Sequence, residues 1–258
     1  QISAGIYPFQ HTPHKDNDIV HAQLCYDLAM DYYVAGLNWA GSPWAFHTIG
    51  STLLINSKHY AQARGFPRRQ AGEDFYLLNK LAKIGHVINL QCTSLALESR
   101  LSDRVPFGTG PALLKIMSLD DPQQQYLYYH PDCFLALKCW LHICQTLQPE
   151  TSGSLTLETI TAAKHRDEAF SNVDSELLLQ CLKALGLDKA MAHAGTHSKT
   201  KDTYARHMHN WFDAFLTLKF IHWMRDNALP SLPLHEIRGL ESTAAIQKQS
   251  GLELYPSA

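Results

Sequence analysis

Apolar residues recur at about one helical turn between residues 18 and 37, which predicts an amphipathic helix there. The segment Ile2–Tyr7 before it is apolar and continuous, as is typical of a buried strand. A Gly-, Ser- and Trp-containing loop at 39–49 follows the helix, then a short apolar strand at 52–55 and a short helix at 58–63. The first part of the chain therefore indicates a mixed α/β structure.

A third helix is predicted from Glu73 to Ile84, ended by Gly85 and followed by a strand at 86–90. The pair Glu73 and Asp74 lies at its N-terminus, after the turn at 65–69. Unpaired backbone amides and the helix dipole stabilise acidic side chains at such a position, by less than about 1 kcal/mol when exposed. Helix capping is thus the simplest interpretation of this pair from the residues alone.

Beyond Leu119, helical spacing replaces the strand-like patterns. The composition changes at 118–122, which predicts two domains, an α/β domain at 1–118 and an all-helical domain at 119–258. The predicted helices of the second domain lie at 131–147, 155–164, 174–185, 201–227 and 234–248.

Charge and cysteine content exclude several classes of function. The chain has 22 Lys and Arg against 24 Asp and Glu, a formal net charge of -2, so nucleic acid is not an expected partner. Its 6 cysteines form no C-x-x-C pair, and no apolar run is long enough to span a membrane. We expect a cytoplasmic protein. Because the chain opens on Gln1 and enters an apolar strand at once, we also expect upstream sequence.

Three segments in order carry a resemblance to a known family. The central one runs from Gly65 to Gly85 and reads GFPRRQAGEDFYLLNKLAKIG, preceded by His47–Thr52 and followed by Ser99–Gly110. Together they resemble the acceptor side of family-2 glycosyltransferases, which have the GT-A fold. The resemblance implies that residues 1–118 are a partial GT-A half and that the nucleotide-binding half lies upstream. That half would end in an Asp-x-Asp motif. Residues 16–18 have these letters, but they start a helix.

The resemblance implies that Asp74 is the general base and that Glu73 supports it. A sugar or glycerol hydroxyl is a poor nucleophile, and a carboxylate within hydrogen-bond reach accepts its proton as the new bond forms. Only one candidate base is apparent, so the expected reaction inverts the anomeric centre. The expected substrates are a nucleotide-sugar donor and a hydroxyl acceptor.

The leaving nucleoside diphosphate needs positive charge, which Arg100 and Arg104 would supply beside a divalent cation, Mg²⁺ or Mn²⁺, in the complete enzyme. Alternatively, these arginines belong to a solvated loop held by Asp103. Thr109 lies between two glycines, and its loop would let backbone amides approach a phosphate. No organic cofactor is expected.

Two further residues are candidates for substrate contact. His47 would bind donor, acceptor or cation, or be structural, and Trp44 would stack on a sugar or pack in the core. The sequence indicates no metal site of its own, because His207 and His209 face different ways on a predicted helix and a probable loop around Gly195 carries two more histidines, His193 and His197.

Two functions remain open from the sequence. The first is a glycosyltransferase whose donor site lies outside this chain, so that the chain alone would be inactive or very weak. The alternative is a non-catalytic helical protein-interaction module on a transferase remnant.

Overall fold

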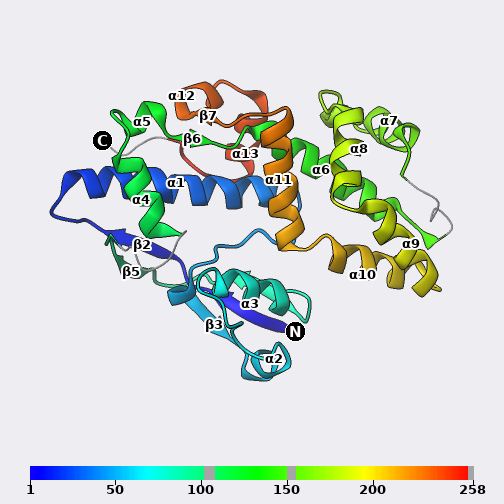
Figure 1. The fold of residues 1–258 in the computed structure, drawn as a ribbon, viewed down its shortest axis with the longest axis horizontal. Helices are drawn as coiled ribbons and strands as arrows, with labels where there is room; N and C mark the ends of the chain where they lie inside the picture. The colour runs from blue at the N-terminus through cyan, green and yellow to red at the C-terminus, as the bar shows by residue number, and fades with distance from the viewer. Residues whose placement is uncertain (102–107, 150–154, 255–258) are drawn as a thin grey trace.

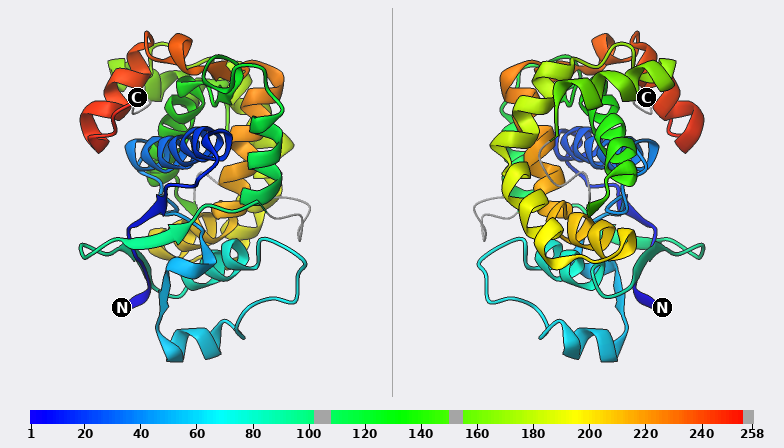
Figure 2. Two further views of the ribbon diagram at one scale, coloured as in Figure 1. Left: turned by 90° about the vertical axis from the view of Figure 1, so that its left-hand side faces the viewer. Right: turned by 90° about the vertical axis from the view of Figure 1, so that its right-hand side faces the viewer.

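A computed structural model describes residues 1–101, 108–149 and 155–254. These residues form a helix-rich α/β structure in which the expected mixture of strands and helices is confirmed. Figures 1 and 2 show a small sheet with helices α2 and α3 at one end of the molecule and the remaining helices gathered at the other. Helix α1 runs between these two parts.

The main sheet has three short strands in the order β3-β1-β4. Strand β1 (Ile2–Ile6) is central, antiparallel to β3 (Leu53–Ile55) and parallel to β4 (His86–Asn89). All three were predicted from the apolar patterns. A second, parallel pair joins β2 (Phe9–Thr12) to β5 (Leu95–Glu98), and two-residue strands β6 (Leu127–Tyr128) and β7 (Leu232–Pro233) pair among the helices. These four strands were not predicted.

Helix α1 (Asn17–Trp39) confirms the predicted helix and extends it by a residue or two at each end. The Asp16 carboxylate caps it by accepting the backbone N–H of Asp18 at 2.9 Å, so residues 16–18 do start a helix. Its second half enters the main helical core through Tyr32, Ala35 and Leu37. The helical core thus includes residues from before the expected boundary at 118.

Helices α2 (Ser57–Gln62) and α3 (Glu73–Leu81) cover the sheet region. Gly72 precedes α3 with φ at +70°, a left-handed conformation that favours glycine. Leu77, Leu78 and Leu81 of α3 are completely buried, and they pack in one cluster with β1. This packing fixes the position of the Glu73–Asp74 pair at the start of α3.

The helical part is more divided than its apolar pattern predicts. The single predicted helix at 201–227 is two helices separated at Asp213, and the one at 234–248 is likewise two. His193 and His197, for which the sequence predicts a loop, lie in a helix. The described helices of this part are α4 (Thr109–Met117), α5 (Pro122–Gln125), α6 (Pro131–Thr146), α7 (Leu157–Arg166), α8 (Ser175–Ala184), α9 (Leu187–His197), α10 (Lys201–Trp211), α11 (Ala214–Asn227), α12 (Leu234–Ile237) and α13 (Glu241–Ser250).

Asp213 explains the break and joins the two parts of the molecule. Its carboxylate accepts the backbone N–H groups of Phe215 and Leu216, which caps α11. The same carboxylate accepts hydrogen bonds from Asn79 of α3 at 3.0 Å and from Lys83 just after α3. The residue that ends one helix and starts the next therefore also holds α3 against the helical part.

Among the described residues, no helix combines the length with the apolar character that crossing a bilayer requires.

Candidate functional site

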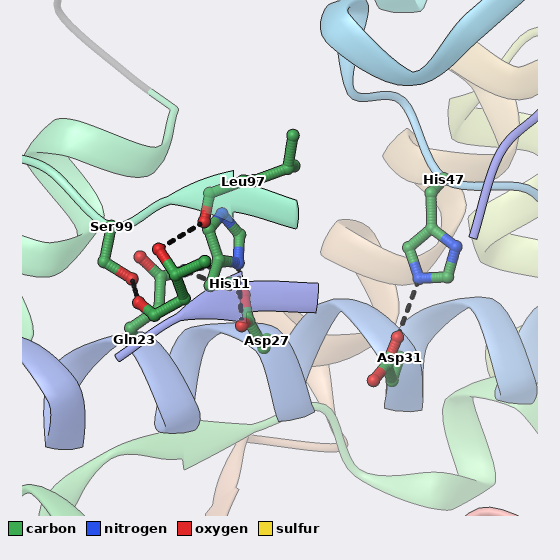
Figure 3. Close-up of polar contacts among 8 residues, drawn as sticks. His11, Gln23, Asp27, Asp31, His47, Leu97 and Ser99 are labelled. Atoms are coloured by element: carbon green, nitrogen blue, oxygen red, sulfur yellow. Dashed lines mark hydrogen bonds and ion pairs between the residues drawn. The ribbon is translucent and has the colours of Figure 1, made fainter. Parts of the chain in front are cut away.

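A row of polar side chains on one face of α1 forms the centre of the candidate site. Asp27 and Asp31 are four residues apart, and neighbours at this spacing lie on the same side of a helix. Asp27 Oδ2 lies 2.9 Å from His11 Nδ1, and Asp31 Oδ1 lies 2.9 Å from His47 Nε2. Figure 3 shows both carboxylates projecting toward their histidines. Two histidine–carboxylate pairs, contributed by three separate segments, thus lie side by side.

The ring of Phe9 lies between the two histidines. Its centroid is 5.7 Å from that of His11 and 5.3 Å from that of His47, and both contacts are edge-to-face. Since each carboxylate contacts one ring nitrogen of its histidine, the other nitrogen, Nε2 of His11 and Nδ1 of His47, is left to contact a ligand or water. The aromatic contact and the carboxylate together fix the orientation of each imidazole.

Gln23 extends the row by one more helical turn. Its amide Nε2 lies 2.8 Å from Asp27 Oδ1 and 3.2 Å from His11 Nδ1. The side chain is buried, and its Oε1 has no hydrogen-bond partner among the described protein atoms. Gln23 therefore braces the Asp27–His11 pair from the interior side.

Asp74, the predicted base, is held at the N-terminus of α3 by backbone amides. The N–H of Phe75 donates to Oδ1 at 2.7 Å, and the N–H of Gly50 donates to Oδ2 at 3.0 Å. Burial raises the pKa of the Asp74 carboxyl, the Phe75 amide opposes this, and the negative charge of Glu73 raises it further. A carboxylate with a raised pKa accepts a proton more readily than an exposed one, as a general base must.

Tyr26 of α1 connects Asp74 to the polar row. Burial raises the pKa of its phenol, a hydrogen bond with the Thr109 side chain lowers it, and the charges of Asp27 and Asp74 raise it again. Thr109 therefore contacts Tyr26, and the charge of Asp74 acts on the same tyrosine. Thr109 is the first residue of α4 and not part of a loop, because Gly108, with φ at +107°, turns the chain into the helix.

The two predicted arginines have different outcomes. Arg100 is exposed and follows Ser99, whose hydroxyl donates to the Thr12 carbonyl at 3.0 Å. It therefore lies near the ends of β2 and β5, on the side where α1 begins, as Figure 3 indicates for Ser99. Arg104 lies outside the described residues, so its role stays a prediction.

Trp44 does not have the open position expected of a ring that stacks on a sugar. Its side chain is 3% exposed, its indole N–H donates to the Phe212 carbonyl at 3.0 Å, and it stacks on His209 at 5.0 Å. Of the two uses that the sequence leaves open, packing fits this position, because the ring is almost wholly buried and its N–H is bonded, with one part of the side chain lining the apolar pocket described below.

Two pockets meet at His47. One, the polar pocket, lies beyond the carboxyl ends of the parallel strands β1 and β4, where ligands of α/β proteins commonly bind. The other, the apolar pocket, lies between α1, the start of α3 and the start of α11. The polar pocket is lined by Phe9, Asp31, His47, Asn89, Gln91 and Ser94 among others. The apolar pocket is lined chiefly by Met30, Val34, Leu37, Phe46, His47, Phe75 and Leu218.

The described residues contain no group of three or more His, Cys, Asp or Glu arranged to hold a metal ion. The described residues nevertheless include groups suited to acid–base chemistry: the half-buried carboxylate of Asp74, which lines neither pocket, and two imidazoles that are each bonded to a carboxylate. These groups are also suited to binding hydroxyl groups, because imidazoles and carboxylates both form hydrogen bonds with hydroxyls.

Sequence reasoning missed most of the polar row. His47, Asp74 and Thr109 were identified, but His11, Gln23, Asp27, Asp31 and Tyr26 were not. The signal that was available is the spacing of Gln23, Asp27 and Asp31, which places three polar side chains on one face of a largely apolar helix.

Comparisons of this chain with protein-family models, with curated proteins and with solved structures found no match.

Proposed function

We propose that this chain is the acceptor-side part of a cytoplasmic, inverting glycosyltransferase. Asp74 accepts the proton of the acceptor hydroxyl, and Glu73 keeps the pKa of Asp74 raised. Arg100, and Arg104 as the resemblance implies, face the diphosphate of a nucleotide-sugar donor. The resemblance of residues 47–52, 65–85 and 99–110 to family-2 glycosyltransferases is the source of these roles.

The arrangement around Asp74 is the observation that carries the proposal. The three segments of the resemblance are separate in the sequence, yet each contributes a residue near Asp74. The backbone N–H of Gly50 donates to Asp74, and Thr109 is hydrogen-bonded to Tyr26, whose pKa the charge of Asp74 raises. A half-buried carboxylate with a raised pKa, aimed by two backbone amides, is what removal of a hydroxyl proton requires.

The proposal requires a donor half contributed by residues other than those described. Strand β3 is an edge of the main sheet, bonded within the described residues only to β1, and its Leu54 is 54% exposed. Edge strands readily accept a further strand. We propose this edge as the place where the nucleotide-binding half joins. The Mg²⁺ or Mn²⁺ that the resemblance implies would neutralise the diphosphate in that half.

The test is donor turnover by the product of the complete gene, screened over nucleotide sugars with Mg²⁺ or Mn²⁺. We expect nucleotide release that depends on an acceptor and falls by at least about 100-fold in Asp74→Asn, because loss of a general base typically costs this much. Asp120→Asn, in an exposed turn outside the site, is the matched control and should leave turnover unchanged. Turnover that survives Asp74→Asn would assign the base elsewhere, and the absence of turnover with every donor would favour the non-catalytic interaction module.

A further inference from the structure

The polar and the apolar pocket share one side chain, and this determines what kind of molecule can occupy both. His47 lines each of them. Its imidazole is partly buried, with 20% of the side chain exposed, and is held by Asp31. A ligand that contacts this imidazole therefore has the polar lining of one pocket and the apolar lining of the other beside it.

The polar pocket has the composition of a carbohydrate-binding site. Planar polar side chains such as Asp31, Asn89 and Gln91 can each contact two neighbouring hydroxyl groups, since carboxylates and amides present two polar atoms at a fixed separation. The ring of Phe9 offers an apolar surface of the kind that packs against C–H groups. Asp31 is well placed for this, because its side chain is 47% exposed while one of its oxygens is already held by His47.

The apolar pocket is lined by apolar side chains, several of which are partly exposed to solvent. Met30 and Val34 are one turn apart on α1, and Leu218 faces them from α11; all three are only partly buried. Phe75, directly after the proposed base Asp74, forms another wall. Partly exposed apolar side chains that surround a pocket gain stability when an apolar group replaces the water there.

We infer that the site binds an amphiphilic glycoside, with its sugar hydroxyls in the polar pocket and an alkyl or aryl group in the apolar pocket. The chemical class is a hydroxyl-bearing head joined to an apolar tail. This inference goes beyond the proposed function, because Asp74 lines neither pocket and the head group need not be the acceptor. The binding itself requires neither a donor nor turnover.

The experiment is calorimetric titration of the chain with butyl, hexyl and octyl β-D-glucosides, below their micelle-forming concentrations. We expect affinity to rise roughly fourfold for each methylene that enters the apolar pocket. Leu218→Trp, which fills that pocket, should abolish the dependence on tail length and retain binding of the head group. Asp31→Ala should weaken all three glucosides by a similar factor, about fivefold to tenfold, and retain the dependence on tail length.

Leu114→Trp is the matched control, because Leu114 is 46% exposed on α4 and does not line either pocket. Val34→Trp provides a second way to fill the apolar pocket if Leu218→Trp lowers the melting temperature. No binding of any glucoside, equal affinity for all tails, or a tail dependence that survives both pocket-filling variants would overturn the inference. The two proposals can fail independently. If the transferase has a purely polar acceptor, turnover would still depend on Asp74, while glucoside affinity would not depend on tail length.

Discussion

The helical part and the sheet region of this molecule are built on very different cores. The helical core joins residues from α1 to beyond α13 and is dominated by large apolar side chains, among them Phe134, Trp140 and Phe220, each completely buried. The core of the sheet region is small, with Ile6, Leu77, Leu78 and Leu81 at its centre, and it has buried polar contacts beside it, such as Ser3 with His59. The candidate site lies at the edge of this smaller core.

The difference indicates how stability and chemistry are divided. Buried polar and charged groups cost free energy unless each is hydrogen-bonded, and a site needs several of them. Helix α1 belongs to both parts: Tyr32 and Leu37 enter the helical core, while Asp27 and Asp31 face the site. The large apolar core thus holds the helix on which much of the polar row is mounted.

The largest effect is expected from Phe134→Ala in the helical core. The ring is fully buried and lies 5.7 Å from that of Tyr32 and 6.5 Å from that of Tyr129, and its removal leaves a cavity. We expect the free energy of unfolding to fall by about 3–5 kcal/mol, measured by urea denaturation. The same substitution at Phe66, which is 41% exposed, should change it by less than about 0.5 kcal/mol. Equal losses at the two positions would contradict the contrast between the cores.

A smaller effect is expected at the junction, from Asp213→Ala. The variant removes the cap of α11 and the partners of Asn79 and Lys83, so we expect a loss of about 2–3 kcal/mol. Asp213→Asn retains an oxygen for the cap but not the charge that faces Lys83, and should lose less. The measurement is thermal unfolding followed by circular dichroism. A loss as small in Asp213→Ala as in Asp213→Asn would mean that the cap of α11 contributes little.

The smallest effect is expected in the site, from Asp74→Asn. Because the pKa of Asp74 is raised in the folded protein, its charged form destabilises the fold. This cost is absent below the ordinary pKa of Asp, grows as the pH rises to the folded-state pKa, and is constant above it. We therefore expect the variant to be more stable than wild type near pH 7, by less than about 1 kcal/mol, because the lost interaction with the helix dipole opposes the gain.

The pH dependence sharpens this last prediction. Melting temperatures of wild type and Asp74→Asn should converge as the pH falls toward 4. Glu73→Gln is the neighbouring control, since it removes a charge from the same helix turn without removing the two amide contacts of Asp74. A variant that is less stable than wild type at pH 7 would show that the carboxylate serves the fold more than the chemistry.

Much of the secondary structure could be predicted from local patterns. The spacing of apolar residues identified α1, α3, α6 and α8, and the acidic residues at their starts do lie in first turns or caps. The breaks within 201–227 and 234–248 were missed, because apolar residues continue at helical spacing through each break. The cap that Asp213 gives α11 is a local signal that was overlooked, and the contacts of Asp213 with α3 add a tertiary reason for the break.

The sequence by itself determined the helix-rich α/β character, the start of α1 at residues 16–18 and the position of Asp74 at a helix N-terminus. These depend on hydrogen bonds and side-chain spacings within a few residues, which a local pattern records. The tertiary structure alone decided that His11 meets Asp27, that His47 meets Asp31 between two pockets, and that Trp44 is buried. Such contacts join a strand, a loop and a helix whose relative positions are set by the packing of the whole core, and no local pattern contains that information.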